Sequence, residues 1–563
     1  MLQAGTGYNK EQYTKPIQEE IPVFNRIEGS FIATANIPDA ATAFHGEPLS
    51  LLFGMCAGAM EFNNRVFLYR HDEPVRVNLN WIRDYILTLK GFRYTERDIR
   101  SFPDLLLERQ HEKGFFYEIV APLTDMHSGA PCRHDGREYR ITSEECALRE
   151  PGSRFGLCRL ELEADIEYLM AEGVHMIWQA TGDDEWLQRN LPRVEKGLRY
   201  IMTDPLRWDA EHQLAKRPRT LDTWDFLDRE DSSWDRAVRP DDPMGIFHGD
   251  NTGLYNAKLL LAKLYRHLND EAAAARHEEE AAALRERIMK HLWNGSFFRH
   301  FLPLAPVNYG VDETYQMSLS NAYALNRNIL NFDERRSVID AYRAMREKYR
   351  GELDDFRNLE PPYPCFKGMK PGAYVNGAIA PFVAGQLALG AFETGMEEYG
   401  VDILKRMGRK MLRDGKIAFL YDWEGRDIGG GPRCWCGAEI MHAECAGLAG
   451  VVDNDRLFRD VTLSPRFAAA REPEAHVRLE YAASGAAAEY HFTADYDKKQ
   501  LGFELLSRHD HAKLRLFVPE EAGELRVSRN GEPADFREER VGAGRYAVVD
   551  AVMPQERVEI TYA

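Results

Sequence analysis

The sequence has few cysteines, no long apolar run and no excess of positive charge. Eight cysteines in 563 residues are too few for a disulfide framework. Cys56, Cys158 and Cys445 lie in apolar helical patterns, where a free thiol packs like a small hydrophobic group. The longest apolar stretches, 49–60 and 378–392, are too short to span a bilayer, so they predict buried helices.

The charge balance and the missing motifs exclude several classes of protein. A net charge of -18 argues against nucleic acid or an anionic membrane as the main partner. The opening residues MLQAGTGYNKEQYTKP contain no apolar core and no small-residue cleavage site, which predicts a cytoplasmic location. There is no Walker loop, no dinucleotide-binding glycine motif and no G-x-S-x-G. We therefore expect no cofactor and a small-molecule partner, for a chain that is a monomer or a homo-oligomer.

From about residue 48 to 452, apolar residues recur at helical spacing in pairs of segments. The predicted pairs are 81–91 with 95–110, 160–182 with 183–204, 251–268 with 270–293, 314–327 with 332–350, 378–395 with 396–414, and 435–451 with 48–62.

The two members of a pair differ in how much of their surface is apolar. Residues 251–268 are apolar nearly all round, whereas 270–293 carry one apolar stripe among glutamates and arginines. An apolar helix belongs inside a fold and an amphipathic helix outside it. Six such hairpins predict two concentric rings, an (α/α)6 barrel; an irregular bundle or a solenoid has the same periodicity.

After residue 462 the apolar period changes from 3.6 to 2, which indicates strands. Asn530-Gly531 is a hairpin-turn signal within this region. The sequence therefore predicts an N-terminal segment of mixed structure (1–47), a barrel (48–460) and a C-terminal antiparallel β-sandwich (461–563). The segment 121–157 is predicted to be a long, loop-like insertion. The predicted strands are 476–481, 488–492, 502–508, 513–519, 524–531, 545–550 and 557–563.

The segment TLDTWDFLDRED (220–231) combines five carboxylates with a tryptophan. An indole stacks on a sugar ring, and a carboxylic acid protonates a leaving oxygen. We interpret Asp225 as a general acid, Trp224 as a stacking wall and Asp222 as an orienting or charge-raising neighbour. An acidic loop with core tryptophans has the same composition.

Other clusters combine residues suited to binding a sugar. Arg83 beside Asp84 can hold adjacent hydroxyls, although an aspartate there also suits a helix start. Asp250 either contacts a ligand or caps the following helix, and loop chemistry alone also accounts for an Asn-Gly before a helix. The further candidates for substrate binding are Trp81, His248, Tyr374 and Asn376.

A last cluster opens the final helix of the predicted barrel. Trp435, Glu439 and His442 share one helical face, so we expect them to point into the same cavity, with Trp435 as a substrate-binding wall. The rival interpretation is a metal site made by Cys434, Cys436, His442 and Cys445, but its spacing is not one that zinc sites use. A second weak metal candidate consists of Asp125, His127, Cys132, His134 and Asp135.

Together these segments resemble the six-hairpin glycosidase superfamily, over roughly residues 80–450. WIRDYILTL resembles the Trp-x-Arg-Asp segment that opens the barrel of glucoamylase-type enzymes. DTWDF resembles both their Asp-x-Trp-acid segment and the Gly-Trp-Asp-Phe segment of trehalases, which implies that Asp225 is the acid. YVNGA is similar to the Asn-Gly-rich segment of trehalase-like and family 63 glucosidases, and WCGAE to the start of their last barrel helix.

The sequence departs from these families at the general base. Counting back from Trp435, the expected position holds Phe419, which cannot activate water. Glu439 is our first candidate for the base and Asp422 our second.

The interpretation is an exo-acting, inverting glycoside hydrolase with a small carbohydrate substrate. The alternatives are a phosphorylase, which needs no base, a non-catalytic carbohydrate-binding protein, and a lyase or isomerase in which His248 or His442 transfers protons.

Overall fold

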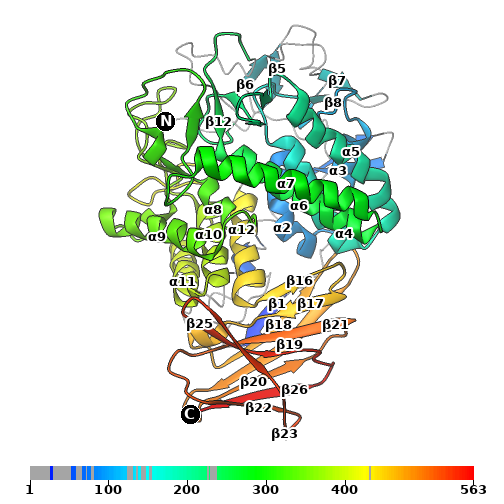
Figure 1. Cartoon of the computed structure of the whole chain (residues 1–563), viewed down its shortest axis with the longest axis vertical. Helices are drawn as coiled ribbons and strands as arrows, with labels where there is room; N and C mark the ends of the chain where they lie inside the picture. The colour runs from blue at the N-terminus through cyan, green and yellow to red at the C-terminus, as the bar shows by residue number, and fades with distance from the viewer. Residues whose placement is uncertain are drawn as a thin grey trace.

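The computed structural model describes residues 26–29, 52, 54–56, 58, 66–70, 73–77, 81–122, 131–134, 137–140, 147–150, 155–224, 227, 238–429, 431 and 433–563. Figure 1 shows helices in the upper part of the view and two large sheets below them, with the C-terminus at the lower end.

The described helices form antiparallel pairs, as the periodicity predicts. The first members of the pairs are α2 (Ile82–Thr95), α4 (Ile166–Thr181), α6 (His248–His267), α8 (Ser320–Ala324), α10 (Pro381–Glu393) and α12 (Arg433–His442). The second members are α3 (Ser101–Glu108), α5 (Asp184–Thr203), α7 (Glu271–Leu292), α9 (Phe332–Tyr349) and α11 (Glu397–Asp414). The described residues of 48–62 are helical, and a π-helical turn, Ala443–Leu448, follows α12.

The first members of the pairs form a closed inner ring. In order along the chain, each of α2, α4, α6, α8, α10 and α12 packs on the next, and α12 packs on α2. Close approach is possible because small residues lie between the helices: a Cβ added to Gly385 of α10 would come within 2.5 Å of the Glu439 backbone of α12. The predicted (α/α)6 barrel is therefore confirmed.

One inner helix is shorter than its prediction of 314–327. Met317 and Ser318 pair with Glu360 and Leu359 as strands, so α8 begins only at Ser320. The predicted helix was too long because strand β14 (Met317–Ser318) is buried like the helix that follows it.

The C-terminal region contains two sheets, as predicted. The first has the order β1 (Arg26–Gly29), β18 (Glu474–Glu480), β19 (Ala487–Asp495), β20 (Gln500–Leu505), β26 (Arg557–Tyr562), β22 (Leu525–Arg529), β23 (Glu532–Pro533). The second has the order β16 (Val451–Asp453), β17 (Asp460–Leu463), β21 (His511–Val518), β25 (Gly544–Val549), β24 (Arg537–Val541). Alternate residues of β18 and β19 are buried, which places the core on one face of the sheet. Asn530 and Gly531 both have positive φ, 50° and 86°, in the tight turn from β22 to β23.

Two strands of these sheets lie outside the predicted range of 461–563. Strand β1 pairs with β18 from near the start of the chain, and β16 precedes the predicted boundary. Both are too short to give a period-2 signal of their own.

The insertion predicted to be loop-like contains strands in its described parts. They are β4 (Ile119–Pro122), β5 (Pro131–His134), β6 (Arg137–Arg140), β7 (Ala147–Arg149) and β8 (Phe155–Cys158). The remaining short strands are β2 (Val66–Arg70), β3 (Glu73–Val77), β9 (Trp208–Asp209), β10 (Leu214–Ala215), β11 (Arg217–Pro218), β12 (Met244–Phe247), β13 (Phe301–Pro303) and β15 (Leu359–Glu360).

The described cysteines and helices agree with the composition of the sequence. Cys56, Cys158 and Cys445 are free and buried, as expected of thiols that pack as hydrophobic groups. None of the helices within the described ranges combines the length and apolar character that crossing a bilayer requires.

The π-helical turn after α12 buries Glu444 completely, and neither carboxylate oxygen has a hydrogen-bond partner among the described residues. Burial raises the pKa of Glu444 well above its usual range. Above about pH 4.5 the unfolded chain ionises while the folded chain stays protonated, so stability is lost as the pH rises from there towards the folded pKa.

We expect Glu444→Gln to remove this pH dependence. The stability of the variant relative to the wild type should rise between pH 4.5 and pH 7, by up to about 1.4 kcal/mol per pH unit. Urea unfolding at both pH values measures the difference, and Glu279→Gln, at an exposed position of α7, is the matched control. If the difference in unfolding free energy between Glu444→Gln and the wild type is the same at both pH values, Glu444 ionises as readily in the folded protein as in the unfolded chain.

Candidate functional site

The predicted site residues gather at one end of the inner ring. Each outer helix returns the chain, so every inner helix begins at the same end of the barrel. Arg83 and Asp84 lie in the first turn of α2, His248 and Asp250 in the first turn of α6, and Trp435 in the first turn of α12. Because helix N-termini carry partial positive charge, this end of the ring favours carboxylates.

An aromatic group forms the centre of this end. The ring of Trp224 lies 5.5 Å from Tyr374, 6.1 Å from Trp435 and 6.0 Å from Phe419, measured between centroids. Phe382 stacks on Trp435 at 4.6 Å with an interplanar angle of 14°. Three predicted substrate-binding residues, Trp224, Tyr374 and Trp435, thus come together from three separate segments.

Asp222 anchors the segment that carries Trp224. Its Oδ1 accepts hydrogen bonds from the Ser320 hydroxyl and from the Thr223 N–H at 2.8 Å, and its Oδ2 accepts from the Ser320 N–H at 3.2 Å. Burial raises the pKa of Asp222, but His248, His300 and the serine hydroxyls outweigh this and hold the pKa below its usual value. Asp222 is therefore an ionised, fixed carboxylate.

His300 holds the same segment from the other side. The Asp222 N–H donates to His300 Nε2 at 2.8 Å, and His300 Nδ1 lies 2.7 Å from the side-chain oxygen of Gln316, which assigns the proton to Nδ1. Burial lowers the pKa of His300 to about 4, so the ring is neutral at physiological pH. Ser320, His300 and Gln316 carried no sequence signal, because they lie between 78 and 98 residues from Asp222 in the chain.

A buried ion network connects Arg83 to the Trp224 segment. Arg83 contacts Glu163 and Asp165, with 2.6 Å from its Nε to Asp165 Oδ2. Arg217 donates from Nη2 to the Trp224 carbonyl at 2.7 Å and lies 3.7 Å from Glu163 Oε2. Arg83 is thus engaged by protein carboxylates, and Arg217 supports the residue that precedes Asp225.

Asp250 is the least constrained carboxylate of the network. It is fully buried, with Arg217 Nη1 3.5 Å from its Oδ1, and neither oxygen has a hydrogen-bond partner among the described residues. Burial, only partly opposed by Arg217, raises the pKa of Asp250 to about 6. It does not cap α6, whose N-cap is Phe247. A raised pKa and unpaired oxygens suit a group that binds or exchanges protons with a ligand.

His248 stacks on Phe298 at 5.5 Å, and its Nδ1 lies 2.9 Å from the Arg299 carbonyl. Its Nε2 has no hydrogen-bond partner within the described part of the chain. Burial lowers the pKa of His248, so a neutral ring with a single donor is favoured at physiological pH.

Glu439 is fully engaged by its neighbours. Its carboxylate accepts from Lys90 Nζ at 2.8 and 2.9 Å, from the Tyr323 hydroxyl at 3.0 Å and from Gln386 at 2.5 Å. Trp435 Nε1 donates to the same Tyr323 hydroxyl at 2.9 Å, which places Trp435 and Glu439 on one helix face. His442 is half-buried, and desolvation lowers its pKa well below the usual range.

Asp422, the second candidate for the base, lies in the loop before α12. Its carboxylate accepts from Arg426 Nε at 2.7 Å and from two backbone N–H groups of the same turn. Burial raises the pKa of Asp422, but these hydrogen bonds outweigh it and lower the pKa below its usual value. Asp422 is therefore ionised and partly exposed.

The remaining candidates have structural contacts or lie outside the described residues. The amide of Asn376 pairs with the backbone of Tyr363, at 2.9 and 3.0 Å, and so holds a loop together. Trp81 is buried at the N-cap of α2, and Asp84 is half-buried. Asp225 lies outside the described residues, as do Asp125, His127 and Asp135. Within the described ranges, no group of three or more histidine, cysteine, aspartate or glutamate side chains is arranged to hold a metal ion.

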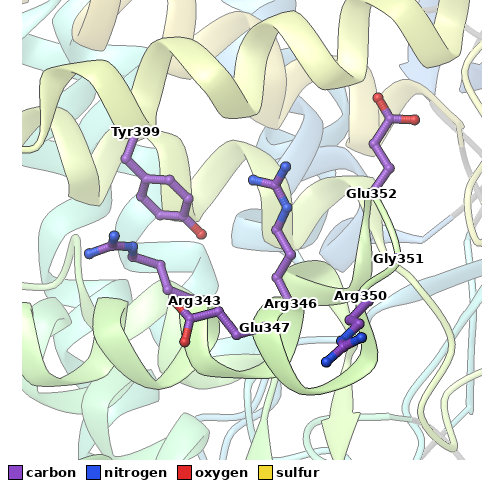
Figure 2. Close-up of a pocket in the computed structure, with 7 residues that line it drawn as sticks. All are labelled: Arg343, Arg346, Glu347, Arg350, Gly351, Glu352 and Tyr399. Carbon is purple, nitrogen blue, oxygen red and sulfur yellow. The ribbon is translucent and has the colours of Figure 1, made fainter.

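A hollow of about 500 Å³ lies elsewhere, between the outer helices α9 and α11 (Figure 2). Two of its three arginines are paired: Arg346 lies 2.9 Å from Asp402 and Arg343 lies 3.2 Å from Asp340. Since it holds none of the predicted chemistry, we place the functional site at the end of the inner ring. The hollow is lined by Arg343, Arg346, Glu347, Arg350, Gly351, Glu352 and Tyr399.

The architecture is an (α/α)6 barrel with an appended β domain, and solved structures share it. The GH78 family rhamnosidase of Bacillus sp. GL1 superposes with a TM-score of 0.57 at 14% identity, over 89% of this chain and 43% of that one. The alpha-L-rhamnosidase of Streptomyces avermitilis, solved in complex with L-rhamnose, superposes with a TM-score of 0.55 at 13% identity, over 96% of this chain and 42% of that one.

This chain thus spans less than half the length of the rhamnosidases it resembles, and the likeness defines its fold. No protein-family model matches the sequence, and no curated protein matches it either.

Proposed function

We propose that the protein is an exo-acting glycoside hydrolase that removes a terminal sugar with inversion at the anomeric carbon. The observation that carries the proposal is the meeting of Trp224, Tyr374 and Trp435 at the N-terminal end of the inner ring. Aromatic faces of this kind stack on the apolar face of a pyranose. Asp225 directly follows Trp224 in the sequence, and in this proposal it acts on the sugar that these rings bind.

Asp225 serves as the general acid in this proposal and protonates the glycosidic oxygen. Two fixed contacts support its segment: the anchored carboxylate of Asp222 and the hydrogen bond from Arg217 to the Trp224 carbonyl. In this proposal Asp250, whose oxygens accept no hydrogen bond from the described residues, accepts hydrogen bonds from sugar hydroxyls.

The contacts favour Asp422 over Glu439 as the base. A base must be ionised and must reach a water molecule on the far side of the sugar, about 6.5–9.5 Å from the acid. Both carboxylates already accept hydrogen bonds from protein groups, but Glu439 is buried whereas Asp422 is partly exposed and can therefore meet water.

A phosphorylase is the second candidate function, and Phe419 favours it. The phenyl ring occupies the position expected for the base and packs edge-on against Trp224, at 90°. In a phosphorylase, phosphate attacks the anomeric carbon directly, so no carboxylate is needed there.

A substrate screen with and without phosphate distinguishes these functions. We expect turnover of at least one 4-nitrophenyl glycoside (α-L-rhamnoside, α-D-glucoside or α-D-mannoside) or disaccharide without phosphate, and proton NMR of the first product should show the inverted anomer. Turnover that requires phosphate would assign a phosphorylase. Binding of sugars without any turnover would assign a carbohydrate-binding protein and refute the hydrolase.

A further inference from the structure

Trp423 is an exposed tryptophan beside the candidate site. It lies in the loop between α11 and α12, and 41% of its surface is exposed. Its Nε1 donates to the Gly377 carbonyl at 2.7 Å, which fixes the indole against the 372–377 turn. An exposed indole held in one orientation is a ready surface for a ligand ring.

Two further contacts hold the indole. The Arg357 guanidinium lies 4.4 Å from its centroid, and Arg357 is itself tied to Asp354 at 2.8 Å. Gly372 packs directly on the indole: an added Cβ would lie 2.9 Å from Cε2, and the φ of Gly372 is +81°. Glycine is therefore needed at this position for both its small size and its conformation.

The same turn carries the aromatic residue that faces Trp224. The Gly372 N–H donates to the Asn376 carbonyl at 2.8 Å and closes the turn, and the ring of Tyr374 lies 5.5 Å from Trp224. Gly372 and Tyr374 are two residues apart, which is at most about 7 Å between Cα atoms. Trp423 thus lies one turn away from the aromatic group on which the terminal sugar stacks in the proposed function.

We propose that Trp423 is a stacking platform for the second sugar ring of the substrate, the one to which the terminal sugar is joined. The proposal rests on the proposed function and extends it: the natural substrate is an oligosaccharide or a glycoside of another sugar, rather than a glycoside of a small alcohol. The Tyr374 turn separates the two rings, with the terminal sugar at Trp224 and the next sugar at Trp423.

The test compares substrates that differ only in the second ring. For the wild type and Trp423→Ala, kcat/KM is measured on rutinose and methyl α-L-rhamnoside, and on maltose and methyl α-D-glucoside. We expect the disaccharide-to-methyl-glycoside ratio to fall about threefold to tenfold in Trp423→Ala, from the loss of one stacking contact. Trp423→Phe, which keeps a ring, should recover most of the ratio. A disaccharide-to-methyl-glycoside ratio of kcat/KM equal to that of the wild type would overturn the proposal. An equal loss of kcat/KM on both substrates would also overturn it, because it would indicate damage to the turn.

Phe332→Ala is the matched control, because Phe332 is exposed to a similar extent, 39%, at the start of the outer helix α9. If the wild type turns over none of the four compounds, the platform is still tested, and the hydrolase itself is decided by the wider substrate screen. Titration calorimetry then compares the affinities for rutinose and rhamnose, and for maltose and glucose. A selective loss of disaccharide affinity in Trp423→Ala would support the platform. An unchanged ratio of disaccharide to monosaccharide affinity would refute it.

Discussion

Asp225→Asn is expected to lower kcat by about 10²-fold or more on any substrate that the screen identifies, because the asparagine amide cannot supply a proton to the leaving oxygen. The loss should be larger for alkyl glycosides than for 4-nitrophenyl glycosides, since a nitrophenolate leaves without protonation. Steady-state kinetics on one substrate of each kind measures both effects.

Asp231→Asn is the control, since it makes the same change at another carboxylate of the acidic segment. It should keep the activity of the wild type, and circular dichroism should show both variants folded. Activity of Asp225→Asn within a few-fold of the wild type on alkyl glycosides would rule out position 225 as the acid. A bell-shaped pH profile that survives the substitution would point instead to histidine-based proton transfer.

Arg217→Met is expected to cost the largest amount of stability, about 3–5 kcal/mol. Arg217 is fully buried and faces two buried carboxylates, those of Glu163 and Asp250. Removing the guanidinium leaves both carboxylates buried without that counter-charge. A buried charge that has lost its partner destabilises the folded state. Urea unfolding at pH 7 measures the loss.

The pH dependence gives this prediction a second test. Burial already raises the pKa of Asp250 to about 6, and loss of Arg217 raises it further. Ionised Asp250 is the species that is penalised in the variant, so the loss of stability should be larger at pH 8 than at pH 5. Arg336→Met removes an exposed arginine paired with Asp340 and should cost much less. If Arg217→Met loses as little stability as Arg336→Met, the ion pairs of Arg217 contribute no net stability.

Much of the fold could be predicted because each segment of the barrel carries its own periodicity. The apolar 251–268 and amphipathic 270–293 segments became α6 and α7 within a few residues. The apolar periodicity did not predict strands that are too short to show an alternation of apolar and polar residues. Met317 and Ser318 were predicted as helix and pair as a strand, and Arg26–Gly29 joins a sheet whose partner is far away in the sequence.

The candidate site was predictable in its residues and not in their partners. Trp224, Tyr374 and Trp435 were chosen from separate motifs and do meet. The pairing of Arg83 with particular carboxylates depends on packing that no local sequence pattern encodes. The same is true of the hydrogen bond from the Asp222 N–H to His300. The catalytic roles of Asp225, Glu439 and Asp422 stay predictions.

The pairing of β1 with β18 has a consequence for the order in which the protein matures. Gly29 lies opposite Ala475, so β1 leaves the ribosome long before its partner is made. Because β18 follows all the helices of the ring in the chain, β1 can join its sheet only after those helices have been synthesised. Loop-closure entropy makes such a long-range pairing costly, so the contacts of β1 with β18 must offset that cost.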